Sequence, residues 1–149
     1  KPKNGDNLSC QGLNRALQLP AVLQQKFALA EAVYVPKLNM GKATTHARMM
    51  QTVVPYVVAN NLSINSQFDA KKDDDKIANS VFSHQGLVLM VWEHSAIHDL
   101  VKALGVKHAP DWQDDDFDSI WIITYHNGKA SLAIDKEGLS PAKSCPSLN

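Results

Sequence analysis

Apolar residues form short unbroken runs in some parts of this chain and recur three and four residues apart in others. Unbroken runs at residues 32–35 and 87–92 predict β-strands, and the second is typical of a strand buried on both faces of a sheet. A third run at 119–126, followed by an Asn-Gly turn and by residues 129–135, predicts a β-hairpin. The tail beyond residue 137 is expected to be a loop.

The segments between these runs have helical spacing, and particular residues mark where helices begin and end. Ser9 suits the N-cap of a first helix, and Pro20 suits the first turn of a second, separate helical stretch. Three aspartates at 73–75 favour the start of another helix. Ser95 is expected to cap a last helix that ends at Gly105.

One further helix is expected between the first two strands, with Thr44 or Thr45 as its cap. Pro55 lies inside this pattern and predicts a kink, or a break just before it. Residues 37–42 are expected to form a loop, and residues 63–68 a weak strand or an extended connection.

Strands thus alternate with helices before the terminal hairpin. This order predicts an α/β fold with three layers, α/β/α, in which a mostly parallel sheet carries the hairpin as its antiparallel edge. The sequence shows no internal repeat and no linker, so residues 1–149 are expected to form a single domain.

The formal net charge is zero, so no overall field attracts the chain to nucleic acid or to anionic lipid. No apolar run reaches the roughly 20 residues that a membrane span needs. Neither nucleic acid nor a membrane is therefore expected as a partner, and the oligomeric state stays open. Cys10 and Cys145 form either one disulfide or two unrelated thiols, and two cysteines alone do not decide between these.

Candidate chemistry lies where the predicted strands end, because ligands of open α/β sheets bind beyond the carboxyl ends of the strands. His94 follows the apolar run 87–92 and precedes a helix, whose N-terminus favours an anion. Arg48 lies in the helix that follows the strand at 32–35. The alternatives are a buried structural histidine and an arginine in a surface ion pair.

Four segments resemble the histidine phosphatases, the phosphoglycerate mutase-like superfamily. Residues 1–20, KPKNGDNLSCQGLNRALQLP, resemble the segment directly after the Arg-His-Gly or Arg-His-Ala signature of that family. Arg48 with Gln51-Thr52 resembles its second motif, and VLMVWEHSAI resembles the strand that delivers its second histidine. DFDSIWIITYHNGKASL is similar to the closing hairpin of a branch whose members are often exported.

The resemblance implies a phosphohydrolase that acts through a phosphohistidine on a small phosphorylated substrate, without a cofactor. Arg48 and His94 would bind the phosphoryl group, and inorganic phosphate would be a ligand as well. The sequence contains no Arg-His-Gly or Arg-His-Ala. The nucleophile is therefore expected upstream of Lys1, on a first strand that the chain lacks, and the chain by itself is expected to be inactive. The alternative is a non-catalytic member that binds a phosphate ligand.

The general acid has two candidates, Asp69 and Glu93, and neither matches the family pattern well. His94 and His98 are four residues apart, as zinc ligands often are, but the chain has no HExxH motif, so no metal site is expected. A metal-dependent hydrolase remains a weaker hypothesis. His46 is expected at the rim or on the surface, and the aspartates at 114–116 in a solvated loop.

Overall fold

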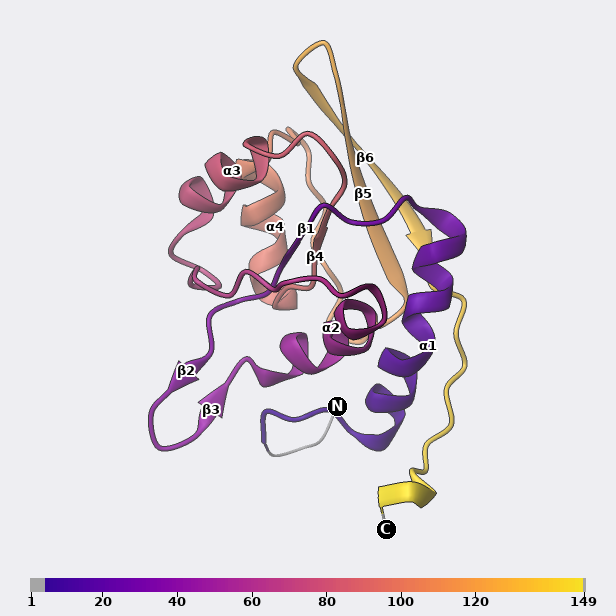
Figure 1. The fold of residues 1–149 in the computed structure, drawn as a ribbon. Helices are drawn as coiled ribbons and strands as arrows, with labels where there is room; N and C mark the ends of the chain where they lie inside the picture. Colours follow the sequence, from indigo (N-terminus) through magenta and orange to yellow (C-terminus); the bar gives the residue numbers. More distant parts are fainter. Residues whose placement is uncertain (1–4, 149) are drawn as a thin grey trace.

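The computed structural model describes residues 5–148. Its elements are, in chain order, α1 (Cys10–Lys26), β1 (Ala32–Tyr34), β2 (Asn39–Met40), β3 (Thr44–Thr45), α2 (Ala47–Asn60), α3 (Asp74–Phe82), β4 (Val88–Met90), α4 (His94–Ala103), β5 (Ser119–His126), β6 (Lys129–Lys136) and the 3-10 helix η1 (Pro146–Leu148) (Figure 1). Helices combine with one parallel and two antiparallel strand pairs, which confirms the α/β class.

β1 and β4 form a parallel pair with Ala32 opposite Val88 and Tyr34 opposite Met90. On its other side β1 makes a parallel bridge with Asn65, whose N–H donates to Val33 O and whose O accepts from Val35 N. The expected extended segment at 63–68 therefore borders the sheet. β1 is paired on both edges, and β4 pairs on one.

The second edge of β4 faces away from β1. Leu87 O accepts from Glu31 N (2.7 Å) and Val91 N donates to Tyr34 O (3.0 Å), so the odd-numbered residues direct their backbone groups toward β1. Because neighbouring residues of a strand point in opposite directions, Val88 and Met90 direct theirs outward. No strand within residues 5–148 pairs with that edge. The prediction of burial on both faces is wrong in degree, since β4 is only half buried.

Two hydrophobic clusters lie against the strands, and alternate side chains of β1 reach different ones. Val33 and Val35 pack with the apolar faces of α1 and α2, whereas Tyr34 packs with those of α3 and α4. Side chains of β4, of Val91 directly after it, and of β5 also contribute to both clusters: Leu89, Val91 and Ile120 to the first, and Val88, Met90 and Ile123 to the second.

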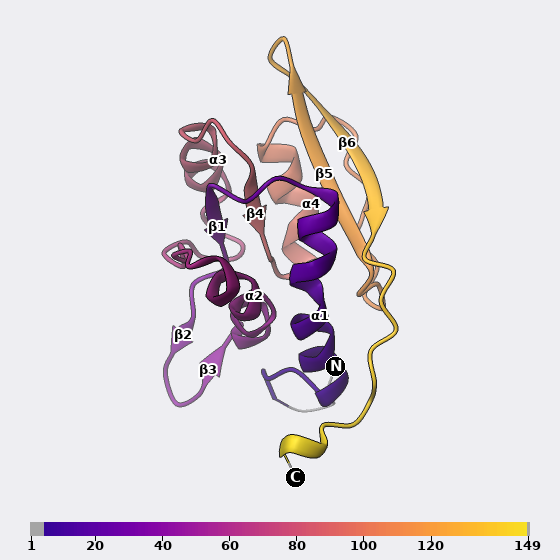
Figure 2. The ribbon, with the colours of Figure 1, turned by 45° about the vertical axis from the view of Figure 1, so that its right-hand side comes forward.

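β5 and β6 form the predicted hairpin, and its turn matches the sequence signal. Asn127 (φ 50°) and Gly128 (φ 76°) both have positive φ, as a two-residue type I′ turn requires. The hairpin is, however, a two-stranded sheet of its own and not an edge of the parallel pair. Side chains attach the hairpin to the helices, and among them is Tyr125, whose hydroxyl donates to Leu104 O (2.6 Å). The tip of the hairpin extends past the helices (Figure 2).

Neither internal proline breaks its helix. Pro20 lies inside one continuous α1, so the predicted separate stretch is wrong. Pro55 lies inside α2, which excludes the break and leaves the kink, the other outcome predicted there. In α1 the buried stripe of Ala16, Leu19 and Leu23 continues past Pro20. Packing of this apolar face against its neighbours outweighs the missing N–H.

The entry to α2 also differs from the prediction. Thr44 and Thr45 do not cap the helix but form β3, which pairs with β2 inside the expected loop region. His46 is the N-cap, in the left-handed region (φ 60°) and without a side-chain capping bond. Ser9 caps α1 as predicted, since its side chain accepts from Gly12 N (3.1 Å).

A disulfide joins Cys10 to Cys145 across a sequence separation of 135 residues, which decides the alternative that the sequence left open. It holds the C-terminal tail against α1, where Asn14 Nδ2 donates to Ala142 O and Ser144 O (both 2.9 Å). Among the helices of the described residues, none is both long and apolar enough to cross a membrane.

Candidate functional site

The segments that border the sheet end at a common edge, where the sequence placed its candidate chemistry. After Asn65 the chain turns at Asp69, and after β4 it reaches Glu93 and His94. Trp92 ties the two together, because its Nε1 donates to Ala70 O (3.0 Å) in the protein interior. Glu93 and His94 therefore follow β4 directly, and the Trp92 bond holds the segment after Asp69 next to the same strand end.

His94 is the first residue of α4, not a residue outside the helix as expected. Its Nδ1 lies 3.5 Å from Glu93 Oε1, and its Nε2 lies 3.2 Å from Asp114 Oδ1. The side chain is 32% exposed, so it is not the buried structural histidine of the alternative interpretation. The imidazole stands at a helix N-terminus between two carboxylates, and Asp114, which is 90% exposed, is free to give way to another anion.

Glu93 is the N-cap of α4, the role that the sequence assigned to Ser95. Its Oε1 accepts from Ser95 N (3.2 Å), and its Oε2 accepts from Ser95 Oγ (2.6 Å) and lies 3.8 Å from Lys71 Nζ. Burial raises the pKa of this carboxyl, but the Ser95 hydrogen bonds, Lys71 and His94 together hold it below the ordinary value. As the structure stands, Glu93 is an ionised acceptor that orients its neighbours.

Asp69 closes a turn of the backbone. Its Oδ1 accepts from Lys71 N (2.9 Å) and Lys72 N (3.1 Å), and its own N–H donates to Asp73 Oδ2 (2.7 Å). The hydrogen bond from Lys71 N is the main reason that the pKa of Asp69 is lowered. Both candidate acids are therefore ionised in the absence of a ligand.

Arg48 lies in the first turn of α2, and its Nη1 donates to Gly5 O (2.9 Å). Gln51 binds the same N-terminal segment, accepting from Leu8 N (2.9 Å) and donating to Asn7 Oδ1 (2.7 Å). Within residues 5–148, no hydrogen bond or ion pair joins Arg48 to His94, and no carboxylate pairs with Arg48. The part of the resemblance at residues 1–4 lies outside the described residues.

His46 has a position that the sequence did not anticipate. Its Nδ1 is buried and has no hydrogen-bond partner among the described residues, and its charge would lower the pKa of Asp69. His46 therefore lies at the start of α2, the helix that also carries Arg48, with a buried ring nitrogen and no hydrogen-bond partner within residues 5–148. A histidine directly before a helix that lacks a capping residue was the only sequence signal for this role.

Comparison with known proteins gives no identification: no family model, curated protein or solved structure matches the chain. Over residues 5–148, no three histidine, cysteine or acidic side chains gather as metal ligands would.

Proposed function

We propose that this chain is the body of a phosphohydrolase of the histidine phosphatase type, in which Arg48 and His94 bind the phosphoryl group. The observation that carries the proposal is the position of His94, at the junction between a parallel strand and the N-terminus of α4. Backbone N–H groups and the helix dipole favour an anion at this junction. Lys71 adds a cation on the far side of Glu93.

Binding of phosphate would exchange one anion for another. In the structure the carboxylate of Asp114, which lies in an exposed loop, contacts Nε2 of His94. A phosphate oxygen would replace this carboxylate as the partner of Nε2. The Arg48 guanidinium would supply a planar pair of donors to two oxygens of the same group. A phosphate dianion beside Glu93 or Asp69 would raise the pKa of either carboxyl, which would favour the protonated form that a general acid needs.

The nucleophilic histidine would come from a strand upstream of Lys1, next to the open edge of β4. In the part of the chain that the structure describes, β5 also has an edge without a strand partner, which supports this proposal. Glu137 N donates to Asp118 O (2.7 Å), so the backbone groups of alternate residues, including Trp121 and Ile123, point away from β6. An added strand between β4 and β5 would meet a hydrophobic cluster on each face, which is the proposed three-layer arrangement.

In the proposed reaction a histidine nitrogen bonds to phosphorus while the bond to the ester oxygen breaks. The acid, Asp69 or Glu93, gives its proton to the leaving oxygen. Water then displaces the histidine and releases inorganic phosphate, with the same carboxylate accepting a proton. The Cys10–Cys145 disulfide supports an exported location, because disulfides persist in oxidising compartments.

A second candidate is a non-catalytic member of the same fold that binds a phosphate ligand. It is favoured by the absence of an Arg-His-Gly or Arg-His-Ala sequence from the chain. Both candidates need phosphate to bind to Arg48 and His94, and they differ in whether a nucleophile accompanies these residues.

Titration of the chain with inorganic phosphate, followed by amide NMR shifts, tests what the two candidates share. We expect saturable shifts around His94 and an affinity loss of about tenfold in His94→Ala and in Arg48→Ala, since each removes a charge-assisted hydrogen bond. His98→Ala is the matched control, one turn further along α4. Absence of saturable binding would reject both candidates.

Hydrolysis of p-nitrophenyl phosphate by the chain extended upstream with its natural residues separates them. The phosphatase should form an acid-labile phosphoenzyme, and His94→Ala should lower its kcat by a factor of about 100 or more. Phosphate binding without hydrolysis by the extended protein would leave the binding module as the function.

A further inference from the structure

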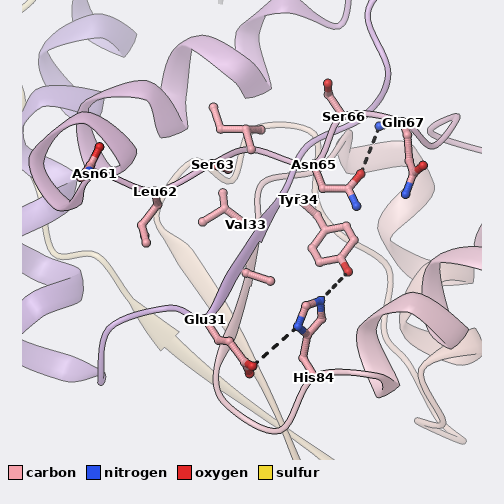
Figure 3. A pocket seen from close by; sticks show the side chains of 12 residues that line it. Glu31, Val33, Tyr34, Asn61, Leu62, Ser63, Asn65, Ser66, Gln67 and His84 are labelled. Carbon is pink, nitrogen blue, oxygen red and sulfur yellow. Dashed lines mark hydrogen bonds and ion pairs between the residues drawn. The ribbon is translucent and has the colours of Figure 1, made fainter.

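A groove of about 640 Å³ runs along the outer edge of β1, where no part of the proposed phosphate site lies (Figure 3). Three segments line it: the start of β1 from Glu31 to Tyr34, residues 61–67 after α2, and His84 after α3. The groove is therefore built by segments far apart in the sequence, held together by β1 and its bridge to Asn65.

One end of the groove is fixed by a chain of four polar side chains. The Tyr34 hydroxyl lies 2.6 Å from Ser80 Oγ and 3.1 Å from His84 Nε2, and His84 Nδ1 lies 3.9 Å from Glu31 Oε1. Glu31 Oε2 also accepts from Gly86 N (2.6 Å). Tyr34 is only 1% exposed and anchors this chain in the core, whereas the Glu31 side chain is 47% exposed.

The remaining polar walls are neutral. Asn61, Ser63, Asn65, Ser66 and Gln67 contribute amides and hydroxyls, each of which can both donate and accept. Asn65 Oδ1 accepts from Gln67 N (3.2 Å), which leaves the Asn65 amide nitrogen as a donor (Figure 3). Among the described residues, no lysine or arginine lines the groove.

This composition selects among ligand classes. An anion would meet the Glu31 carboxylate without a lining cation to compensate it, and a wholly apolar molecule would leave the amides unpaired. Ligand hydroxyl groups are uncharged, so they avoid repulsion by Glu31. They both donate and accept, so they can pair with the amides and hydroxyls that line the groove. We propose that this groove binds a neutral carbohydrate, with Glu31 accepting from sugar hydroxyls and Asn65 donating to them.

The partners of Glu31 fix its carboxylate in one position, so the proposed binding site is preorganised. Gly86 and His84 hold the carboxylate in place before any ligand arrives, so little conformational entropy is lost on binding. A clasp that only attached α3 to β1 would need Tyr34, Ser80 and His84, but not a half-exposed carboxylate that lines the same groove as Asn65.

Amide NMR titration with cellobiose, maltose and N,N′-diacetylchitobiose tests the proposal. We expect at least one disaccharide to give saturable shifts at residues 61–67 and at His84, with a Kd of about 1 mM. Glu31→Gln and Asn65→Ala should each weaken this binding about tenfold. Asn39→Ala, outside the groove, should leave it unchanged, and far-UV circular dichroism confirms that each variant is folded.

Two results would overturn the proposal. One is the absence of saturable shifts with all three disaccharides at about 50 mM, well above the expected Kd. The other is an unchanged affinity in folded Glu31→Gln and Asn65→Ala. Inorganic phosphate should not compete with the disaccharide, so this test and that of the phosphate site succeed or fail separately.

Discussion

Beside β1, polar side chains are linked through the buried Tyr34, whereas at the carboxyl end of β4 His94 meets the carboxylates of Glu93 and Asp114 near the surface. Tyr34 holds His84 from within the core, but His94 is held by Glu93 and by Asp114 from a loop. Buried hydrogen bonds fix geometry, while exposed ion pairs contribute little and exchange partners readily. The first region suits a neutral ligand that needs a prepared surface, and the second suits an anion that replaces a carboxylate.

The largest loss of stability is expected from the one buried hydrogen bond described at the carboxyl end of β4, which Trp92 donates to Ala70. Trp92→Phe removes the donor to Ala70 O, leaves that carbonyl unpaired and opens space in the second cluster. We expect a loss of about 2 kcal/mol in the free energy of unfolding, measured with urea. Trp121→Phe is the control, since no hydrogen bond from its indole is found within the described residues. An equal loss in both variants would contradict the role of the Trp92 bond.

Tyr34→Phe should have the next largest effect. It removes the hydroxyl that Ser80 and His84 share, and the expected loss is about 1.5 kcal/mol in the free energy of unfolding. Tyr125→Phe removes a single hydrogen bond at a half-exposed position and should cost less. A larger loss in Tyr125→Phe than in Tyr34→Phe would contradict the role of the shared Tyr34 hydroxyl.

Much of the fold could be predicted because its signals are local. The hairpin has an apolar run, an Asn-Gly turn and a second run within 18 residues, and the helices begin and end close to their expected caps. Pro20 gave a wrong break and Pro55 does not end α2, because packing of a helix face is a tertiary effect that a proline signal does not contain. The separation of the hairpin from β4 was likewise beyond local pattern, since pairing depends on distant segments.

The candidate site was predicted in part for the same reason. Glu93 and His94 follow a strand, so their position beyond its carboxyl end could be derived from α/β geometry, and the structure has them at the start of α4. The partners Lys71 and Asp114 come from loops of no recognisable pattern and could not be derived. The groove beside β1 was missed entirely, because Glu31, Asn65 and His84 converge only in three dimensions.

Glu93→Gln should give a smaller effect that depends on pH. The folded-state pKa of Glu93 is lowered, so its charge stabilises the protein above the unfolded-state pKa, and this contribution disappears as pH falls through the folded-state value. We expect the variant to be less stable by about 1 kcal/mol at pH 7. Urea unfolding across a pH series measures the free energy of unfolding of the unchanged protein and of Glu93→Gln. If the difference between them stayed the same in acid, the charge of Glu93 would be excluded as its cause.

The smallest expected effect is also the one that most directly tests the exchange of anions at His94. Asp114→Asn removes an exposed carboxylate, so the free energy of unfolding should not change measurably. Phosphate affinity should nevertheless rise about twofold to threefold at low salt, because the competitor at His94 Nε2 is gone, and the gain should shrink at about 0.15 M salt through screening. Asp115→Asn makes the same charge change in the same loop, where the described residues show no ion pair from Asp115 to His94. Equal gains in the two variants would assign the effect to net charge, and a gain confined to Asp114→Asn would show that this carboxylate and phosphate compete for one imidazole.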